Sequence, residues 1–239
     1  MRAPDTILPL RAERLGFSAG GVAILSDVSI TIDAGAPTLI LGPNGAGKSV
    51  LLRLLHGLLV PSAGRVVWAA QGHAARRQAM VFQRPVLLRR SVLANALYPL
   101  KLAGVAASER QDRARAALDM VGLAALADRP ARRLSGGERQ RLALARAAAL
   151  APEVLFLDEP SASLDPAATG AVEEIVRRLA ARGTKIVMTT HDLGQARRLA
   201  GEVVFVHRGR VLERTPADAF VTHPATPEAA AFLRGELVW

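Results

Sequence analysis

The chain has 239 residues, half of them hydrophobic, so it can build a full core in one large domain or two small ones. It contains no cysteine, which excludes disulfides, thiolate metal sites and cysteine nucleophiles. The net charge is +10, and nearly all of the basic residues are arginine. Because alanine is abundant as well, we attribute this charge to a general compositional bias of the chain rather than to a nucleic-acid or membrane partner. No signal peptide and no apolar run near the ~20 residues of a membrane span is visible, so we expect a soluble chain.

The first predicted elements are strands followed by a helix. Residues 24–32 nearly alternate apolar and polar side chains, which predicts an antiparallel sheet near the N-terminus. Residues 37–42 are apolar on both faces and end in glycine, as a central parallel strand does. Residues 48–59 continue with helical periodicity. Two more strands are expected over 65–70 and 78–82.

The middle of the chain changes character from Ser91 onward. It becomes rich in alanine and leucine with few β-branched residues, which favours helix. We interpret residues 84–134 as a helical insertion between two strands. A further helix is expected from Ser135 to about Leu150, because Ser135 and Glu138 have the spacing of a capping box.

The remainder alternates between buried-type strands and short helices. Asp165 is placed to cap a helix, with Pro166 at its first position and Gly183 past its end. Arg208 and Gly209 predict the turn of a hairpin. The expected elements are a strand over 154–159, a helix over 165–183, a strand over 185–191, a helix over 192–201, a hairpin over 202–213 and a mostly helical tail over 216–239.

The clearest chemical motif is GPNGAGKS at 42–49, which matches the phosphate-binding pattern G-x-x-x-x-G-K-[ST] in full. Its glycines let backbone N–H groups turn toward phosphate oxygens, and the following helix aims its positive end there. Lys48 is expected to reach the β- and γ-phosphates of ATP, and Ser49 to ligate Mg²⁺. A chance glycine-rich turn is disfavoured because a strand and a helix flank the motif in the right order. The predicted nucleotide-binding residues are Gly42, Pro43, Asn44, Gly45, Ala46, Gly47, Lys48, Ser49 and Val50.

Four polar residues follow predicted strands at the edge where α/β sheets bind ligands. Asp158 can hold Mg²⁺ through water, and Glu159 can polarise the water that attacks the γ-phosphate. His191 could contact the γ-phosphate, and Gln83 could sense metal and water. Each of these residues alone is weak evidence for a catalytic site, since such residues are common at strand ends. A phosphate loop upstream makes the assignment stronger. The predicted catalytic residues are Glu159, His191 and Gln83, and the predicted metal ligands are Ser49, Gln83 and Asp158.

These motifs predict an α/β fold with a P-loop NTPase core. The core has a mostly parallel sheet, with an N-terminal antiparallel β subdomain and an inserted α-helical subdomain. We expect one domain over 1–239. Its core would comprise 1–83 and 135–239, and its helical subdomain 84–134.

A second anion pocket is predicted in LSGGE at 134–138. Ser135, Gly136 and Gly137 expose N–H groups at a helix start, far along the chain from the first phosphate loop. The motifs GPNGAGKS, Gln83, LSGGE, VLFLDEP, SLD and His191 occur in the order seen in ATP-binding cassette (ABC) ATPases, and the chain resembles that family over nearly its whole length.

The resemblance implies that two copies of the chain pack head to tail and enclose two ATP molecules. Residues 135–137 would then contact the γ-phosphate held by the partner copy, and Asp165 would lie at the interface between copies. Glu159 would be the catalytic base. Gln83 and the stretch 84–92 would couple the nucleotide to a membrane subunit.

Three positions depart from the family pattern. Ala19, with Phe17 nearby, stands where an aromatic residue usually stacks on adenine, so the resemblance supplies no stacking residue here. Glu138 stands where glutamine is common. Val50 stands where threonine is usual, directly after the Mg²⁺ serine.

The resemblance implies the ATPase subunit of a membrane transporter, with ATP as substrate and Mg²⁺ as cofactor. A single cassette without a span is typical of importers built from separate transmembrane permease subunits and a solute-binding protein. The stretches 80–92 and 190–200 resemble importer ATPases for tungstate or related oxyanions, or for phosphate. We therefore expect a peripheral protein on the cytoplasmic face of the inner membrane.

Two other classes stay open at this point. An exporter or lipoprotein-release ATPase needs the same chemistry. A soluble ABC protein acting on ribosomes or DNA would use the positive charge, but such proteins carry two cassettes or a long coiled-coil insertion, and this sequence has neither. No nucleic-acid partner is therefore expected.

Overall fold

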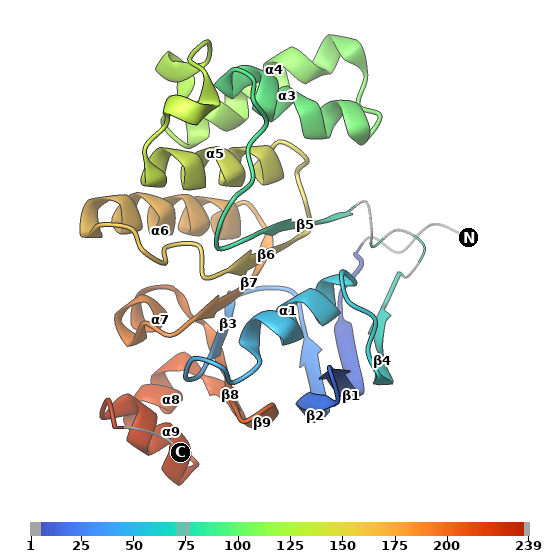
Figure 1. The fold of residues 1–239 in the computed structure, drawn as a ribbon, viewed down its shortest axis with the longest axis vertical. Helices are drawn as coiled ribbons and strands as arrows, with labels where there is room; N and C mark the ends of the chain where they lie inside the picture. The colour runs from blue at the N-terminus through green and yellow to red at the C-terminus, as the bar shows by residue number, and fades with distance from the viewer. Residues whose placement is uncertain (1–5, 71, 73, 75–76, 237–239) are drawn as a thin grey trace. The chain divides into compact units, whose positions relative to one another are not determined.

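The computed structural model describes residues 6–70, 72, 74 and 77–236 (Figure 1). They belong to two compact units, one made of Met1–Ala75 and Lys185–Trp239 and the other of Arg76–Thr184. Residues 237–239 of the tail expected over 216–239 lie outside the described residues. Within the described ranges, every helix is too short or too polar to traverse a bilayer.

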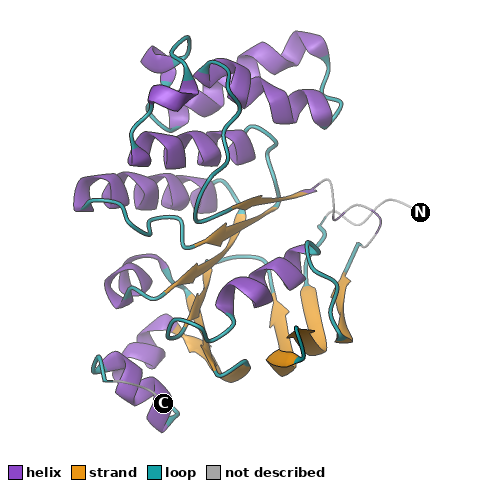
Figure 2. Ribbon diagram, in the orientation of Figure 1, coloured by secondary structure: helices purple, strands orange, loops and turns teal. Residues whose placement is uncertain are grey.

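The first unit contains a three-stranded antiparallel sheet in the order β2-β1-β4 (Figure 2). Its strands are β1 (Leu10–Ala19), β2 (Val22–Ile32) and β4 (Ala63–Trp68). In β2, positions 28, 30 and 32 are buried and position 29 is exposed, because successive side chains of a strand point to opposite faces. The predicted N-terminal antiparallel subdomain is confirmed.

The same unit holds a second set of strands in the order β7-β3-β8-β9. β3 (Thr38–Leu41) lies between β7 (Lys185–Thr190) and β8 (Glu202–His207) and is parallel to both. β9 (Arg210–Pro216) pairs antiparallel with β8, as the predicted hairpin requires. All four residues of β3 are buried, in agreement with its continuous apolar run.

The first helix is shorter than its sequence pattern predicts. Periodicity continues to residue 59, but α1 ends at His56. Gly57 adopts a left-handed conformation with φ 87°, and its N–H group donates to the carbonyl of Leu54, which closes the last turn. The described part of the first unit includes the helices α1 (Lys48–His56), α7 (Leu193–Leu199), α8 (Ala217–Thr222) and α9 (Pro227–Leu233).

In the second unit, β5 (Gln78–Val81) pairs in parallel with β6 (Val154–Asp158). Two helices, α5 (Gly136–Ala148) and α6 (Pro166–Ala181), pack against each other, and α5 also packs against β5. Together with the parallel strands of the first unit, this confirms the predicted α/β class with mostly parallel strands.

The predicted insertion forms two helices and two short turns. α3 (Val92–Leu102) and α4 (Ala107–Met120) pack against each other and against α5 (Figure 1). The end of the insertion, also expected to be helical, forms 3-10 turns at Ala124–Leu126 and Ala131–Arg133 instead of an α-helix. Pro130 separates these turns, and proline cannot supply the N–H group that a continuous α-helix needs. The limits of a separate helical subdomain remain a prediction.

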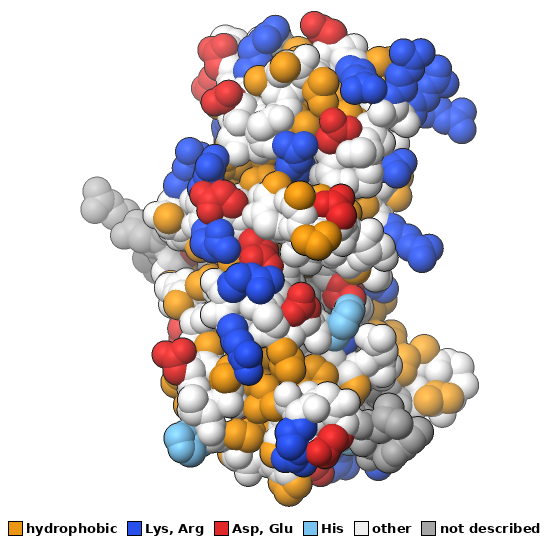
Figure 3. Space-filling model, turned by 90° about the vertical axis from the view of Figure 1, so that its left-hand side faces the viewer, with side chains coloured by type: hydrophobic (Ala, Val, Ile, Leu, Met, Phe, Trp, Pro, Cys, Tyr) orange, Lys and Arg blue, Asp and Glu red, His pale blue; other side chains and the backbone are white. Residues whose placement is uncertain are grey.

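Basic side chains are interspersed with acidic and apolar ones on the face drawn in Figure 3. On α6, Arg177 and Arg178 both donate to Glu174 at 2.9 Å. Part of the positive charge is thus balanced locally, which fits a compositional origin for the arginine excess.

Candidate nucleotide-binding site

The loop between β3 and α1 requires glycine at two positions. Gly42 has a φ of 150°, and a Cβ there would lie 2.0 Å from the backbone oxygen of Val206 on β8. Gly47 has a left-handed φ of 98°, and a Cβ there would lie 2.8 Å from Cδ2 of Leu25 on β2. A larger residue at either position would push the loop away from these strands. Both glycines of the phosphate-binding pattern therefore have a packing reason.

The start of α1 is suited to an anion. Its N-cap residue is Gly47, which has no side chain to accept a hydrogen bond from the first turn. The first N–H groups of any helix lack acceptors within the helix, and the helix dipole adds partial positive charge there. A phosphate group fits this end of α1 by shape and by charge.

The ammonium group of Lys48 folds back over the same loop. Lys48 is only 5% exposed, and its Nζ donates to the carbonyl oxygens of Gly42 at 2.8 Å and Pro43 at 3.0 Å. These neutral acceptors hold the positive charge beside the start of α1. Because charged oxygens make stronger hydrogen bonds than neutral ones, a phosphate in the loop would compete for this ammonium.

The first unit also brings His191 to the edge where the phosphate loop begins. Leu41 ends β3 and pairs with Thr190, which ends β7, so Gly42 and His191 leave neighbouring parallel strands at one edge. The residue after the histidine is fixed, since the Asp192 N–H donates to Thr190 Oγ1 at 3.1 Å and its carboxylate caps α7. The phosphate loop and His191 therefore lie at one edge of the parallel strands.

In the second unit, Gln83 and the two acids leave a common sheet edge. Val81, the last residue of β5, pairs with Leu157 on β6. The chain that follows β5 therefore lies beside the carboxyl end of β6. Asp158 ends β6 and is 2% exposed, whereas Gln83 is exposed.

Glu159 has an unusual backbone conformation. Its φ is 44°, in the left-handed region that residues other than glycine rarely adopt. Such a conformation costs on the order of 1 kcal/mol and is found preferentially at functional sites. The sequence singled out Glu159 by its charge and position, but it gave no sign of this conformation.

The second anion pocket begins with the predicted capping box. The Ser135 Oγ accepts from the Glu138 N–H at 3.2 Å, and the Glu138 carboxylate accepts from the Ser135 N–H at 2.7 Å. That backbone hydrogen bond is the main reason why the pKa of Glu138 lies below its usual value. The cap fixes the first turn of α5, so the N–H groups of Gly136 and Gly137 have a defined direction.

The two glycines of this pocket are not equivalent. A Cβ at Gly137 would lie 2.8 Å from Cβ of Ala168 on α6, so only glycine allows this approach of the two helices. A Cβ at Gly136 would be 3.8 Å from Leu164, an ordinary contact. Gly137 thus has a packing role that the sequence motif does not reveal.

Three other residues singled out in the sequence, Asp165, Ala19 and Phe17, have defined places. Asp165, expected at an interface between copies, caps α6 by accepting from the Ala168 N–H at 2.8 Å. Ala19 is the exposed last residue of β1, and Phe17 is half-buried.

The structure thus arranges the predicted site residues in three groups. The phosphate loop and His191 share an edge in the first unit, and Gln83, Asp158 and Glu159 share an edge in the second. Residues 135–137 form the third group, at the start of α5.

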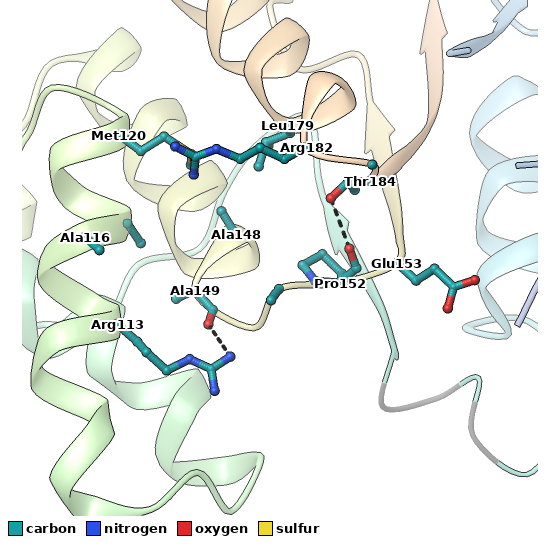
Figure 4. A pocket seen from close by; sticks show the side chains of 13 residues that line it. Arg113, Ala116, Met120, Ala148, Ala149, Pro152, Glu153, Leu179, Arg182 and Thr184 are labelled. Carbon is teal, nitrogen blue, oxygen red and sulfur yellow. Dashed lines mark hydrogen bonds between the residues drawn. The ribbon is translucent and has the colours of Figure 1, made fainter. Parts of the chain in front are cut away.

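A cavity of about 430 Å³ in the second unit lies at the other end of β6 (Figure 4). It is lined by α4, by the connection from α5 to β6 and by the end of α6. On its sides, Arg113 donates to the Ala149 carbonyl at 3.2 Å and Thr184 Oγ1 donates to the Pro152 carbonyl at 3.1 Å. No predicted site residue lines it, so it is separate from the nucleotide site.

Comparison with known proteins gives the family. Residues 25–162 match the model of the ABC transporter family. The chain is 38% identical over 259 residues to phosphate import ATP-binding protein PstB 2 of Natronomonas pharaonis, covering 100% of this chain and 91% of that protein. It is 40% identical over 216 residues to tungstate uptake system ATP-binding protein TupC of Peptoclostridium acidaminophilum, covering 89% of this chain and 100% of that protein.

A solved structure gives the same result for the fold. The dimeric structure of MJ0796, a bacterial ABC transporter cassette, superposes with a TM-score of 0.78 and 26% identity, covering 87% of this chain and 98% of that one. The predicted resemblance is confirmed: the chain belongs to the ABC transporter family and is one of its ATP-binding cassette ATPases.

Proposed function

We propose that the chain is the ATP-hydrolysing subunit of a membrane importer and works as a head-to-tail dimer of two copies. One observation carries the dimer: a single chain has two helix starts shaped for an anion, at α1 and at α5. A nucleotide bound by the phosphate loop of one chain uses only the helix start at α1. The second is explained if it contacts the nucleotide bound by another copy, and the dimeric MJ0796 cassette supports this arrangement.

In this proposal the loop 42–49 binds the phosphates of ATP. Backbone N–H groups of the loop and of α1 donate to phosphate oxygens, and Lys48 exchanges the carbonyl oxygens of Gly42 and Pro43 for the β- and γ-phosphates. Ser49, Asp158 and Gln83 carry the oxygen ligands that Mg²⁺ prefers. Bound Mg²⁺ would neutralise charge on the phosphates during transfer.

The hydrolytic step then falls to residues at the two sheet edges. Glu159 takes a proton from the attacking water while the water oxygen bonds to the γ-phosphorus and the bond to the ADP oxygen breaks. His191 donates a hydrogen bond to the γ-phosphate or holds the water. Residues 135–137 of the second copy lose their anion once the γ-phosphate leaves, so hydrolysis releases the dimer.

The membrane partner is proposed to dock on the stretch 84–92. This stretch begins with an exposed apolar surface, since Val86 is 81% exposed and Phe82, just before it, is 41% exposed. A partner that covers these side chains would remove apolar surface from water. Separate permease subunits, with a solute-binding protein, would place the chain peripherally on the cytoplasmic face of the inner membrane, as the import systems of its relatives suggest.

For the transported solute, we propose tungstate or a related oxyanion. TupC and PstB 2 are named for tungstate uptake and phosphate import. The cassette does not contact the solute, so the discrimination lies in its partners. Loss of the chain should abolish high-affinity uptake of labelled tungstate or phosphate, whereas unchanged uptake of both would reject this solute class.

The catalytic assignment is tested by Glu159→Gln. The variant should bind ATP, form a stable dimer and lose nearly all turnover, about 10²-fold or more, because general-base catalysis contributes that much. Phosphate release and size-exclusion chromatography measure the two effects. Glu153→Gln, at the amino end of the same strand, is the matched control and should keep its turnover. Normal hydrolysis by Glu159→Gln would falsify the assignment of the base.

A further inference from the structure

The stretch 84–92 is held in shape by a buried side chain of α3. Asn95 is fully buried, and its Oδ1 accepts from the Leu88 N–H at 2.8 Å. Its Nδ2 donates to the carbonyls of Leu88 at 3.1 Å and Ser91 at 2.9 Å. One amide thus satisfies both backbone groups of Leu88, as a neighbouring strand would. Without this side chain the half-buried N–H group of Leu88 would lose its partner, whereas the carbonyls of Leu88 and Ser91 would keep the backbone N–H groups of Arg90 and Asn95.

A second side chain holds the same stretch from α5. Arg146 lies near the end of that helix, and its Nη1 donates to the carbonyl oxygen of Val86 at 2.6 Å. The Nε of Arg146 is buried and meets no acceptor among the described residues. Burial lowers the pKa of its guanidinium. Burying a charged guanidinium with an unsatisfied Nε is unfavourable. Because Arg146 is nevertheless placed where it donates to the Val86 carbonyl, we interpret it as a residue that positions this backbone.

The two ends of α5 touch two different functional elements. Its start is the capped pocket at Ser135, and its last turn carries Arg146. The helix has 13 residues and no internal proline or glycine beyond its first turn, so it spans about 20 Å as one rigid element. A movement of the start of α5 at Ser135 is therefore transmitted to the stretch 84–92, because Arg146 is hydrogen-bonded to it.

We propose that Arg146 and Asn95 are positioning residues that hold residues 86–91 in the shape that receives the membrane partner. Through Arg146, α5 transmits the state of the Ser135 pocket to that stretch. This inference rests on the proposed function, because it takes the pocket to bind ATP of a second copy. It adds the physical link between that pocket and the docking stretch.

The test uses the full-length Glu159→Gln chain, in which ATP is expected to trap the dimer. Amide hydrogen exchange of the peptide that covers 84–91 is measured with and without ATP. ATP should change its exchange rate by about threefold or more. With Arg146→Met added, the dimer should still form, but exchange of 84–91 should rise about tenfold and no longer respond to ATP.

Two further variants separate positioning from general loss of structure. Arg113→Met is the matched control, since Arg113 also donates to a backbone carbonyl near the end of α5, that of Ala149 (Figure 4). It should leave the ATP response of 84–91 intact. Arg146→Lys keeps a donor and should restore part of the response, and it carries the test if Arg146→Met does not fold.

The outcomes distinguish the inference from the proposed function. If ATP forms no dimer in the Glu159→Gln chain, the proposed function is overturned and this inference with it. If the dimer forms normally and 84–91 still responds to ATP in Arg146→Met, the inference alone is overturned. An equal loss in Arg113→Met would also reject it, because the effect would then be general.

Discussion

At the scale of single residues, the two glycines of the second anion pocket should respond differently to alanine. Gly137→Ala would place a Cβ against Ala168, so we expect destabilisation by about 1–3 kcal/mol, the usual cost of overpacking. Gly136→Ala has room and should change the free energy of unfolding by less than about 1 kcal/mol. Urea unfolding of both variants measures this. Equal stability of the two would contradict the packing role of Gly137.

Glu138 makes the start of α5 sensitive to acid. The folded protein lowers its pKa, chiefly through the Ser135 N–H, so the carboxylate stabilises the fold above its ordinary pKa of about 4.3. That stabilisation is fully present at neutral pH and is lost as the pH falls through the folded pKa. Glu138→Gln should cost under about 0.5 kcal/mol at pH 7, because glutamine keeps the capping hydrogen bond and solvent screens the lost charge, and the cost should be smaller at pH 3.5. Urea titrations at both pH values test the sign.

Motif reading could propose the site residues but not two structural properties of Gly137 and Glu159. Phosphate chemistry needs glycine, lysine and serine at set spacings, so 42–49 could be assigned from the sequence. The contact of Gly137 with Ala168 depends on how α5 and α6 pack, which no local pattern encodes. The left-handed conformation of Glu159 is likewise imposed by surrounding structure.

At the scale of elements, local signals predicted where helices begin better than where they end. Ser135 and Asp165 are N-caps as expected, because a side-chain oxygen that accepts from the first turn is a local feature. α1 stops at His56 although apolar residues continue, because Gly57 takes a left-handed conformation. The strand order β7-β3-β8 joins distant segments, and periodicity alone contains no such pairing.

The tail helices are attached to the sheet by an aromatic cluster. The ring of Phe205 on β8 lies 5.7 Å from that of Phe220 on α8 and 5.3 Å from that of Phe232 on α9. Phe220 is fully buried, so Phe220→Ala should lower the free energy of unfolding by about 3–5 kcal/mol. Phe82→Ala is the control, since Phe82 is 41% exposed and should cost under about 1 kcal/mol. Chemical denaturation compares them, and similar costs would argue against a structural role of the cluster.

At the scale of the whole molecule, the proposed dimer predicts complementation between defective copies. A Lys48→Ala chain keeps its pocket at Ser135, and a Ser135→Arg chain keeps its phosphate loop. Mixing them should restore one composite site per mixed dimer, and thus a turnover of up to about a quarter of the parent value, because half of the dimers are mixed and each has one of two sites. Phosphate release measures it.

Each variant alone serves as the control for this mixture and should be nearly inactive. A mixture no more active than its two components would reject sites shared between copies. A Ser135→Arg chain that is fully active alone, as a monomer, would reject them as well.

The hydrogen bonds from Lys48 to the carbonyls of Gly42 and Pro43 affect how fast ATP can bind. An isolated ammonium must shed its water before it can pair with a phosphoryl oxygen, and that step costs several kcal/mol. At 5% exposure, Lys48 has already shed most of its hydration shell during folding, with Gly42 and Pro43 as substitutes for water. An incoming triphosphate therefore replaces carbonyl acceptors of the ammonium group and does not have to dehydrate it. We expect ATP to associate with the loop at close to the rate of diffusional encounter.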